Sequence, residues 1–366
     1  MKCENKKALL EKSSNMMLDL LKKLKTDGNK VVIYGASDAG KNYVNVLGLY
    51  DIPILCFIDD DLKKQNSKFC GITVCSMETF IRKWGNGEEV ILVASYSPSV
   101  IINKLREKFS IYYERVKWSD FYLWENELNY FLYYQKNINL LNRVLDLLCD
   151  EKSKSVFRNL LNYKISRNRL LIEEIQDNAE EQYFTSEIIK MTDQEVFLDL
   201  GAYTGDSIRQ FCKVSEGKYA KIIAVEPDEM NFQKLKENTK GFPAIDYHQV
   251  GIADKNGIAK FAAQALYTSH FDEEGSTEIE TKSVDSIMRG NKVTFIKADI
   301  EGLETEMIKG ARYTIETYKP KVAIAVYHKK EDIFNILLLL YAYRSDYKFY
   351  MRHYTEMPID TVLYAI

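Results

Sequence analysis

Short apolar runs and amphipathic segments alternate along the first third of the chain. Leucines and methionines spaced three or four residues apart predict a helix over residues 5–26, and a shorter helix is predicted over residues 77–83. Continuous apolar runs predict strands at residues 30–34, 54–58, 71–74 and 90–94. This alternation is typical of a small parallel sheet with helices on both faces.

Strand patterns stop between residues 118 and 190. Apolar positions at helical spacing predict helices there instead, with a second such pattern over residues 156–175. Tyrosine and phenylalanine are dense at the start of this region, and core packing explains them better than sugar stacking because large aromatic side chains bury so much area. We therefore predict a helical connector at residues 118–180, between a Rossmann-like domain at residues 1–117 and a second α/β domain at residues 181–366.

A buried strand runs into a glycine-bearing turn near the start of that second domain. The apolar run 196–200 is interrupted only by Asp199, and Gly201 and Gly205 allow a tight turn into a helix. Two glycines alone favour an ordinary junction and a ligand loop about equally. In an open α/β sheet, however, ligands bind at the carboxyl ends of the strands.

Acidic residues follow the neighbouring predicted strands. Glu226 comes 25 residues after Gly201, which is close to the spacing of an acid that binds ribose hydroxyls. Asp299 and Glu301 end a later strand and would face the same crevice. Several buried acids need a cation, hydroxyls or an amino group to satisfy them, and the sulfonium and ammonium groups of S-adenosylmethionine would do so. Two acids without a third ligand are a weak signal for a metal ion, and we expect none.

Composition narrows the class of protein. The chain has 366 residues, 46% of them hydrophobic and 28% charged, as in soluble globular proteins of two domains. A net charge of -3 gives no electrostatic case for nucleic acid. The longest apolar run, 336–342, is too short to span a bilayer, and the amino terminus lacks the pattern of a signal peptide. Six scattered cysteines favour reduced thiols, so we expect a cytoplasmic protein.

A second glycine-bearing loop lies in the amino-terminal domain. Gly35, Ser37 and Gly40 follow the first predicted strand, and Asp59 ends the next one. These residues predict a pocket for a nucleotide or nucleotide-linked sugar, but Ser37 occupies the place of the middle glycine in the dinucleotide fingerprint. An empty crevice in a sheet that serves docking or dimerisation is an equally good interpretation.

Six motifs in the carboxyl-terminal half resemble one family in combination. They are FLDLGAYTGDS, IIAVEP, SVDSI, FIKADIEGLETEMIKGA, AVYHK and KFYMRHY. In this order they resemble the FkbM family of S-adenosylmethionine-dependent methyltransferases over about residues 180 to 366. The resemblance implies a class I methyltransferase fold, with a seven-stranded sheet whose last hairpin, here residues 347–352 and 361–366, is antiparallel. It also implies O-methylation of a sugar, glycan or related small molecule. The loop GxSxxG with the strand end IDDD resembles the Rossmann-like domains of sugar O-acyltransferases.

The FkbM resemblance assigns site residues by position. The loop on the methionine side of S-adenosylmethionine comprises Asp199, Gly201, Tyr203 and Gly205. Glu226 binds the ribose, and Asp299 faces the methyl-transfer region. The end of a third strand predicted over residues 245–253 supplies an adenine site at Gly251, Ile252 and Asp254. Tyr183 and Phe184 precede the first strand, where such enzymes often close over the cofactor.

Methyl transfer to an oxygen needs an aligned acceptor and a base that takes its proton. His328 follows a predicted strand at its carboxyl end and is the leading general base, because imidazole titrates near neutral pH. His353, at the end of a later strand, is a second candidate. Asp299 or Glu301 are alternative bases.

Two other functions stay open on the sequence. One is a nicotinamide-dependent oxidoreductase that uses the amino-terminal sheet, against which the serine at position 37 counts. The other is a module that binds S-adenosylmethionine without catalysis. For the methyltransferase we expect a small-molecule or glycan substrate, including a nucleotide-linked sugar, with no nucleic-acid partner and no membrane span. Homo-oligomerisation stays open.

Overall fold

The computed structural model describes residues 9–85, 89–117, 129–262, 270–271 and 277–366. The chain divides into two compact units, and neither is a single continuous segment. One unit comprises Met1–Asn137 with Arg158–Glu174, and the other comprises Ile138–Phe157 with Ile175–Ile366. Among the described residues, no helix is both long enough and apolar enough to cross a bilayer.

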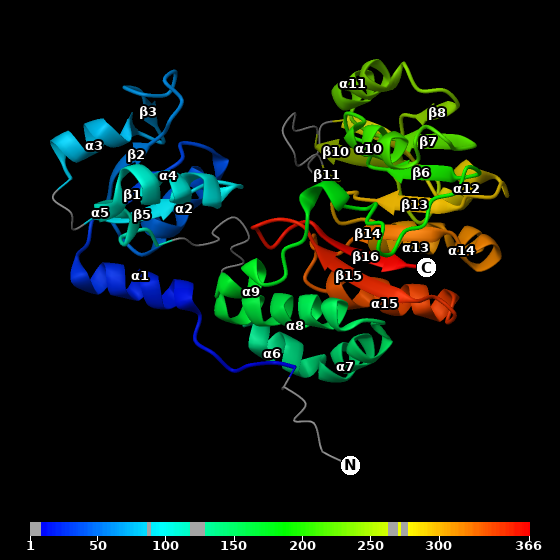
Figure 1. Cartoon of the computed structure of the whole chain (residues 1–366), viewed down its shortest axis with the longest axis horizontal. Coiled ribbons are helices and arrows are strands. Elements are labelled where there is room, and N and C mark those ends of the chain that lie inside the picture. The colour runs from blue at the N-terminus through cyan, green and yellow to red at the C-terminus, as the bar shows by residue number, and fades with distance from the viewer. Residues whose placement is uncertain (1–8, 86–88, 118–128, 263–269, 272–276) are drawn as a thin grey trace, which may run out of the picture. The chain divides into compact units, whose positions relative to one another are not determined.

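The amino-terminal unit contains a five-stranded sheet in the order β3-β4-β2-β1-β5, parallel except for β3 (Figure 1). Its strands are β1 (Val31–Tyr34), β2 (Ile54–Ile58), β3 (Lys68–Phe69), β4 (Ile72–Cys75) and β5 (Val90–Val93). Its helices include α1 (Met16–Asp27), α2 (Asp38–Leu49), α3 (Met77–Lys83), α4 (Pro98–Lys108), α5 (Ser110–Tyr113), α6 (Tyr130–Lys136) and α9 (Leu170–Glu173). The chain leaves β1 on one side toward β2 and later returns to its other side as β5, so this sheet has a topological switch point between β1 and β5.

Helix α1 starts later than the apolar spacing predicts. The Asn15 side chain accepts hydrogen bonds from the backbone N–H groups of Met17 and Leu18, which ends the preceding extended segment and begins the helix at Met16. The described residues 9–15 are not helical, and residues 5–8 lie outside the described residues. Gly28, with φ of 64°, ends the helix as expected.

The carboxyl-terminal unit contains a seven-stranded sheet in the order β15-β16-β14-β13-β6-β7-β8. Its strands are β6 (Val196–Leu200), β7 (Lys221–Val225), β8 (Ile245–His248), β13 (Phe295–Ala298), β14 (Lys321–Ala325), β15 (Phe349–His353) and β16 (Thr361–Ala365). The first five of these run parallel, and β16 is antiparallel to both β14 and β15. The prediction of an α/β protein with a class I methyltransferase sheet and an antiparallel final hairpin is confirmed.

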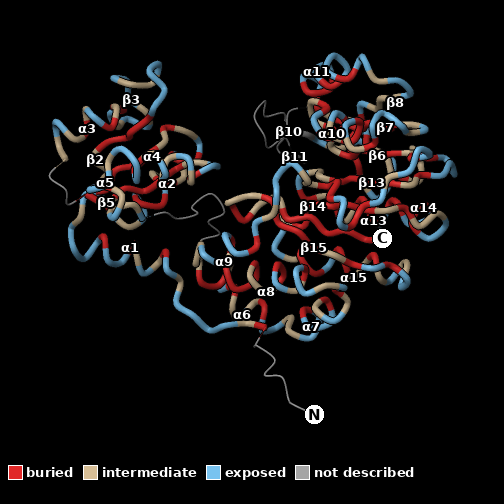
Figure 2. The backbone as a smooth tube through the Cα atoms, in the orientation of Figure 1, coloured by how far each residue is buried: buried red, intermediate tan, exposed pale blue. Residues whose placement is uncertain are grey.

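Helices accompany the strands of this second unit. They are α7 (Ile138–Leu147), part of α8 (Glu151–Ser166), α10 (Asp206–Val214), α11 (Glu229–Thr239), α12 (Val284–Met288), α13 (Glu304–Gly310), α14 (Arg312–Tyr318) and α15 (Asp332–Tyr343), with a short 3-10 turn at Ala179–Glu181. Figure 2 shows the central strands mostly in the colour of buried residues.

Aromatic side chains fill one face of the seven-stranded sheet. Phe197 of β6 stacks on Phe211 of α10 with ring centroids 4.3 Å apart, and Phe295 of β13 lies 5.2 Å from Phe197. Phe184 contacts all three rings and is buried. Phe184 therefore belongs to the core, which fixes the segment before β6 against the sheet.

The third strand is shorter than predicted. Residues 245–253 divide into β8, which ends at His248, and β9 (Gly251–Ile252), which joins a separate sheet. That four-stranded sheet has the order β11-β10-β12-β9 and includes β10 (Gly257–Ala262), β11 (His270–Phe271) and β12 (Thr277–Lys282). Ladder pairing of Gly251 with Thr281 of β12 draws the chain out of the main sheet after His248.

Candidate functional site

The loop after β6 is anchored by a buried ion pair that joins two neighbouring strands. Asp199 of β6 lies opposite Lys297 of β13 in the ladder, and Lys297 Nζ is 3.1 Å from Asp199 Oδ1. Ser207 Oγ donates to the other oxygen, Asp199 Oδ2, at 2.5 Å. Burial alone would lower the pKa of Lys297, but the charges of Asp199, Asp299 and Asp206 hold that pKa above its ordinary value, so the lysine stays charged.

Lys297 also fixes the first turn of the loop, since its Nζ donates to the carbonyl oxygen of Gly201 at 2.7 Å. Gly201 has φ of 74°, and a Cβ there would lie 1.9 Å from the Asp299 carbonyl oxygen. Only glycine therefore lets the ends of β6 and β13 come this close. Gly205, with φ of 85°, begins α10.

The loop after β6 is tied to the end of β7 by Glu226. The backbone N–H of Tyr203 donates to Glu226 Oε2 at 2.9 Å, and the N–H of Asp228 donates to Oε1 at 3.1 Å. Glu226 is only 5% exposed, and its burial, opposed by those two hydrogen bonds, raises its pKa to about 7. Further hydrogen-bond donors, such as the hydroxyls of a ribose, would stabilise its charged form.

Asp299, at the end of β13, receives hydrogen bonds from two tyrosines. Tyr183 Oη donates to Asp299 Oδ2 at 2.6 Å, and Tyr327 Oη donates to Oδ1 at 3.2 Å. Burial and the charge of Asp299 raise the pKa of Tyr183, so the phenol stays protonated as a donor. Burial alone would raise the pKa of Asp299, but His328, Lys297 and the tyrosine hydroxyls hold it below its ordinary value. Asp299 is therefore a fixed negative charge.

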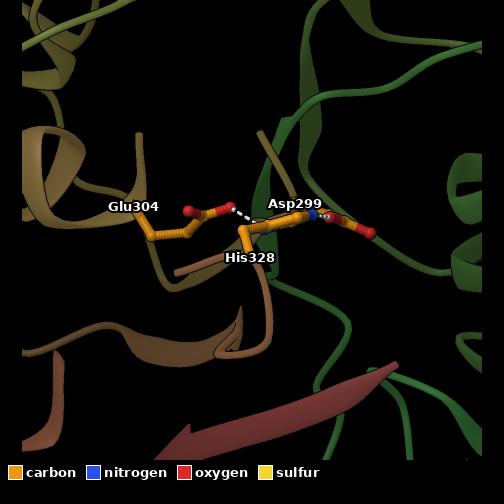
Figure 3. A group of neighbouring side chains, drawn as sticks. All are labelled: Asp299, Glu304 and His328. Atoms are coloured by element: carbon orange, nitrogen blue, oxygen red, sulfur yellow. Dashed lines mark ion pairs between the residues drawn. The ribbon is translucent and has the colours of Figure 1, made fainter. Parts of the chain in front are cut away.

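His328 lies at the carboxyl end of β14 between carboxylates on its two sides (Figure 3). Its Nδ1 is 2.9 Å from Glu304 Oε1, while its Nε2 is 3.4 Å from Asp299 Oδ1 and 3.6 Å from Glu301 Oε2. Glu304 is fully buried in the first turn of α13 and also accepts the backbone N–H of Ile300. Burial would lower the pKa of His328, but Glu304, Asp299 and Glu301 outweigh it and raise that pKa to about 9.

Negative charge exceeds positive charge around this histidine. The pKa of Asp332 is raised to about 7 by burial and by Glu304, and the pKa of Asp360 is raised to about 6 by burial and by Asp299. Two neighbouring carboxyl groups thus resist ionisation. A cationic ligand near Asp299 would relieve this repulsion.

The group also meets a first requirement of a metal site. Ligand atoms of Asp299, Glu304 and His328 lie within 4.8 Å of one another. Figure 3 shows Glu304 and Asp299 on opposite sides of the His328 ring, so the two acids approach different ring nitrogens. One ion binds one ring nitrogen, whereas the two acids lie nearest to different nitrogens of this ring. The residues fit a cationic organic ligand better than a metal ion.

The other predicted catalytic residue lies elsewhere. His353 is fully buried, with its Nδ1 2.8 Å from Thr361 Oγ1, and burial lowers its pKa to about 4. Its side chain thus has no surface from which to meet a substrate. Its contacts are those of a core residue of the final hairpin.

The predicted adenine residues surround β9. Gly251 and Ile252 are buried, while Asp254 is exposed in the turn that follows. Because β8 ends at His248, these residues lie in the four-stranded sheet and not at the end of a strand in the main sheet. The adenine site stays a prediction.

In the amino-terminal unit, backbone atoms of the protein itself fill the space beside the glycines of the predicted nucleotide loop. A Cβ at Gly35, which has φ of 119°, would lie 2.2 Å from the Ala94 carbonyl oxygen, and a Cβ at Gly40 would lie 2.3 Å from the Gly35 carbonyl oxygen. Asp59 Oδ2 accepts the N–H of Ala36 at 2.9 Å. Close backbone packing thus accounts for both glycines, and a nucleotide pocket here stays a prediction.

Lys297, Glu304 and Tyr327 have no role in the sequence-based site, although they surround it in the structure. A lysine within a strand that is buried on both faces needs an acidic partner, and Asp199 occupies the matching place in the adjacent strand. That signal was present in the sequence for Lys297. Glu304 and Tyr327 carry no such signal, because their contacts depend on how α13 and the end of β14 pack together.

Two family models match different parts of the chain. The model described as methyltransferase FkbM domain matches residues 199–349, and the model described as C-methyltransferase C-terminal domain matches residues 5–93. The resemblance of the amino-terminal half to sugar O-acyltransferases is not tested by these matches. No curated protein matches the chain.

One solved structure shares the fold over nearly the whole chain. The crystal structure of methyltransferase FkbM from Methylobacillus flagellatus KT is 23% identical, and the alignment covers 94% of this chain and 93% of that chain with a TM-score of 0.74. UDP-D-quinovosamine 4-dehydrogenase from Vibrio fischeri is 30% identical over 25% of this chain and 75% of its own, with a TM-score of 0.20. Fibrillarin from Aeropyrum pernix, in complex with S-adenosyl-L-methionine, is 11% identical over 52% of this chain and 76% of its own, with a TM-score of 0.35. The last two superpose too poorly to bear on function.

Proposed function

We propose that this chain, whose carboxyl-terminal half carries a methyltransferase FkbM domain, transfers a methyl group from S-adenosylmethionine to a hydroxyl of a sugar, glycan or related small molecule. The observation that carries the proposal is the contact of His328 with Glu304 on one side and Asp299 on the other, at the same sheet edge as the glycine loop. Such a pair, a histidine oriented by a buried carboxylate, is a recurring arrangement for proton transfer.

The methyl donor fits the residues around the glycine loop. Glu226 has a raised pKa of about 7 and would hold the ribose hydroxyls, because donors to its oxygens favour the carboxylate. The surplus of carboxylates around His328 favours a ligand that carries positive charge. When bound, S-adenosylmethionine supplies an electrophilic methyl group. Gly201 and Tyr203 would lie beside its methionine part.

His328 would remove the proton from the acceptor hydroxyl through Nε2. Glu304 holds the ring by Nδ1 and stabilises the imidazolium that proton removal produces. Asp299 and Glu301 approach the same Nε2, and their partly exposed oxygens can accept hydrogen bonds from the hydroxyls of an acceptor. Asp299 or Glu301 remains the alternative base.

A hydroxyl-rich acceptor suits this surface. Within the site, carboxylate oxygens of Asp299 and Glu301 and the hydroxyl of Tyr327 gather around Nε2, and a sugar offers several hydroxyls to such acceptors. A nucleotide-linked sugar presented by the amino-terminal sheet remains part of this proposal.

The proposal is tested with S-adenosylmethionine labelled in its methyl group. The full chain should transfer label to a small-molecule or glycan fraction of a cell extract, and His328→Ala should lower turnover about a hundredfold while calorimetric affinity for S-adenosylhomocysteine changes little. Equal losses of turnover and of cofactor affinity would show that His328 is structural. Transfer of label only to protein or nucleic acid would contradict the acceptor class.

The pH dependence separates a base from a mere contact. Because the pKa of His328 is raised to about 9, the neutral form becomes more abundant as pH rises, and turnover should increase between pH 6 and pH 9. Glu304→Gln removes the main charge that raises this pKa, so the rise should move to lower pH. An unmoved profile in Glu304→Gln would assign the base to another residue.

A further inference from the structure

A cavity of about 730 Å³ lies on one face of the seven-stranded sheet, away from the site described above. Its lining includes Val196 and Lys221, the first residues of β6 and β7, whereas Gly201 and Glu226 follow the last residues of the same strands. A five-residue strand is about 16 Å long, so the two sites are separated by roughly that length. Helix α12 and the residues after it form the opposite wall.

The cavity has an apolar floor and a cationic rim. Ile223 and Met288 are buried on the floor, beside Val196 and Ile287. The charged lining residues are four cations and one acid: Lys221, Lys282, Arg289, Lys292 and Asp246. This local excess of positive charge stands out in a chain whose net charge is -3.

Two of these cations have no counter-ion in the part of the chain that the structure describes. Lys221 pairs with Asp246 at 2.5 Å, and Lys282 pairs with Glu280 at 3.2 Å. Arg289 and Lys292 form no ion pair with a described residue, and both are exposed. They are therefore available to an anion that enters the cavity.

The pKa of His248, which also lines the cavity, is affected by the same positive charges. Burial lowers the pKa of His248, and Lys282, Lys221 and Arg289 lower it further, while Asp246 alone opposes them. Three cations thus act on one imidazole, which stays neutral. A neutral imidazole can donate a hydrogen bond without adding to the charge of the cavity.

We infer that this cavity binds a phosphorylated small molecule of nucleotide size, with its phosphates at Arg289 and Lys292 and its ring on the apolar floor. The guanidinium of arginine matches phosphate oxygens in a two-point contact, and lysine adds a point charge. The volume lies within the range of small-molecule pockets, which combine an apolar lining with a few polar groups. This inference does not depend on the proposed methyl transfer.

Calorimetry with the full chain at low salt tests the inference. The probes are uridine diphosphate, which lacks the adenine that the cofactor site would bind, and inorganic pyrophosphate, which lacks the ring. Uridine diphosphate should bind at least tenfold more tightly than pyrophosphate, because only the nucleotide can use Ile223 and Met288. Saturation with S-adenosylhomocysteine should leave both affinities unchanged.

Charge reversal locates the site. The double variant Arg289→Glu with Lys292→Glu should bind uridine diphosphate at least tenfold more weakly than the unaltered chain. The control variant Lys234→Glu with Lys348→Glu reverses two exposed lysines outside the cavity and should keep the original affinity. Circular dichroism confirms folding, and the single variants Arg289→Gln and Lys292→Gln replace the double variant if its melting temperature falls.

Three outcomes would overturn the inference. The first is no binding of either probe to the unaltered chain. The second is unchanged uridine diphosphate affinity in the cavity variants, which would place the nucleotide elsewhere. The third is equal affinity for the two probes, which would show that the ring of the nucleotide does not bind to the apolar floor.

Discussion

Single residues at the candidate site differ in ionisation from what their residue type alone suggests. Histidine has an ordinary pKa near neutral pH, but three carboxylates raise the pKa of His328 to about 9. Glu226 enters as an ordinary acid, but burial raises its pKa to about 7. Both groups therefore titrate in the range in which the enzyme would be assayed.

Cofactor affinity should depend on pH through Glu226. A raised pKa means that the carboxyl group is partly protonated near pH 7 and becomes a carboxylate as pH rises, so affinity for S-adenosylhomocysteine should increase by several-fold from pH 6 to pH 8. Glu226→Gln cannot ionise, and calorimetry should find its affinity at least tenfold weaker and nearly constant across this range. A pH dependence that persists in the variant would assign it to another group.

The pair between Asp199 and Lys297 should be strongly coupled. Lys297→Met leaves a buried carboxylate without its cation and should lower the free energy of unfolding by about 3–5 kcal/mol. The double variant Asp199→Asn with Lys297→Met removes both charges and should recover most of that loss. Urea unfolding of Lys297→Met, of Asp199→Asn and of the double variant measures the coupling, and additive losses would contradict it.

Position along the chain located Asp299 and His328, because both follow strands whose carboxyl ends meet at one edge of the sheet. Position along the chain does not predict contacts that depend on how the elements pack. Glu304 reaches His328 only because the first turn of α13 packs beside the end of β14, and no spacing in the sequence encodes that packing. His353 also follows from its place at a strand end in the sequence, and in the structure that place is a buried core position.

Among the elements, one of the six motifs that carry the family resemblance caps two helices. In the stretch SVDSI, Ser283 caps α12 by accepting the N–H of Ser286. Asp285 accepts the N–H groups of Tyr313 and Thr314 at 2.9 Å each and so caps α14, which has no side-chain cap of its own. The motif therefore joins two helices of the fold, and its role is structural.

Loss of this cap should be measurable. Asp285→Ala leaves the first N–H groups of α14 without an acceptor and should lower the free energy of unfolding by about 1–2 kcal/mol. Asp285→Asn keeps one side-chain acceptor and should lose less. Affinity for S-adenosylhomocysteine should be unchanged in both variants, and a large loss of affinity would instead connect Asp285 with the ligand site.

For the whole molecule, the sequence predicts the α/β fold class correctly, and it places the domain limits where the strand patterns stop and resume. In the structure, residues 138–157 belong to the carboxyl-terminal unit. There Arg352 of β15, which is 3% exposed, pairs with Asp150 at 2.8 Å. Cys149 also donates its N–H to the Phe349 carbonyl oxygen at 2.9 Å. Hydrophobic periodicity in the sequence does not predict these contacts, because they join segments about two hundred residues apart.

The choice of starting residue should therefore decide whether a fragment folds. A fragment of residues 181–366 lacks both Asp150 and Asp177 and leaves the Arg352 charge with only the longer contact to Glu187, at 3.5 Å, so it should not unfold cooperatively. A fragment of residues 138–366 retains the pair and should unfold in one transition in urea. Cooperative unfolding of the shorter fragment would show that residues 138–157 are dispensable.

The buried pair of Asp199 and Lys297 also has a consequence for descent. Each residue is harmful to lose while the other remains, so a lineage that carries both cannot discard them one substitution at a time without passing through an unstable intermediate. The two positions should change together or not at all among related chains. Where related chains lack the pair, we expect two apolar residues to have replaced both members together.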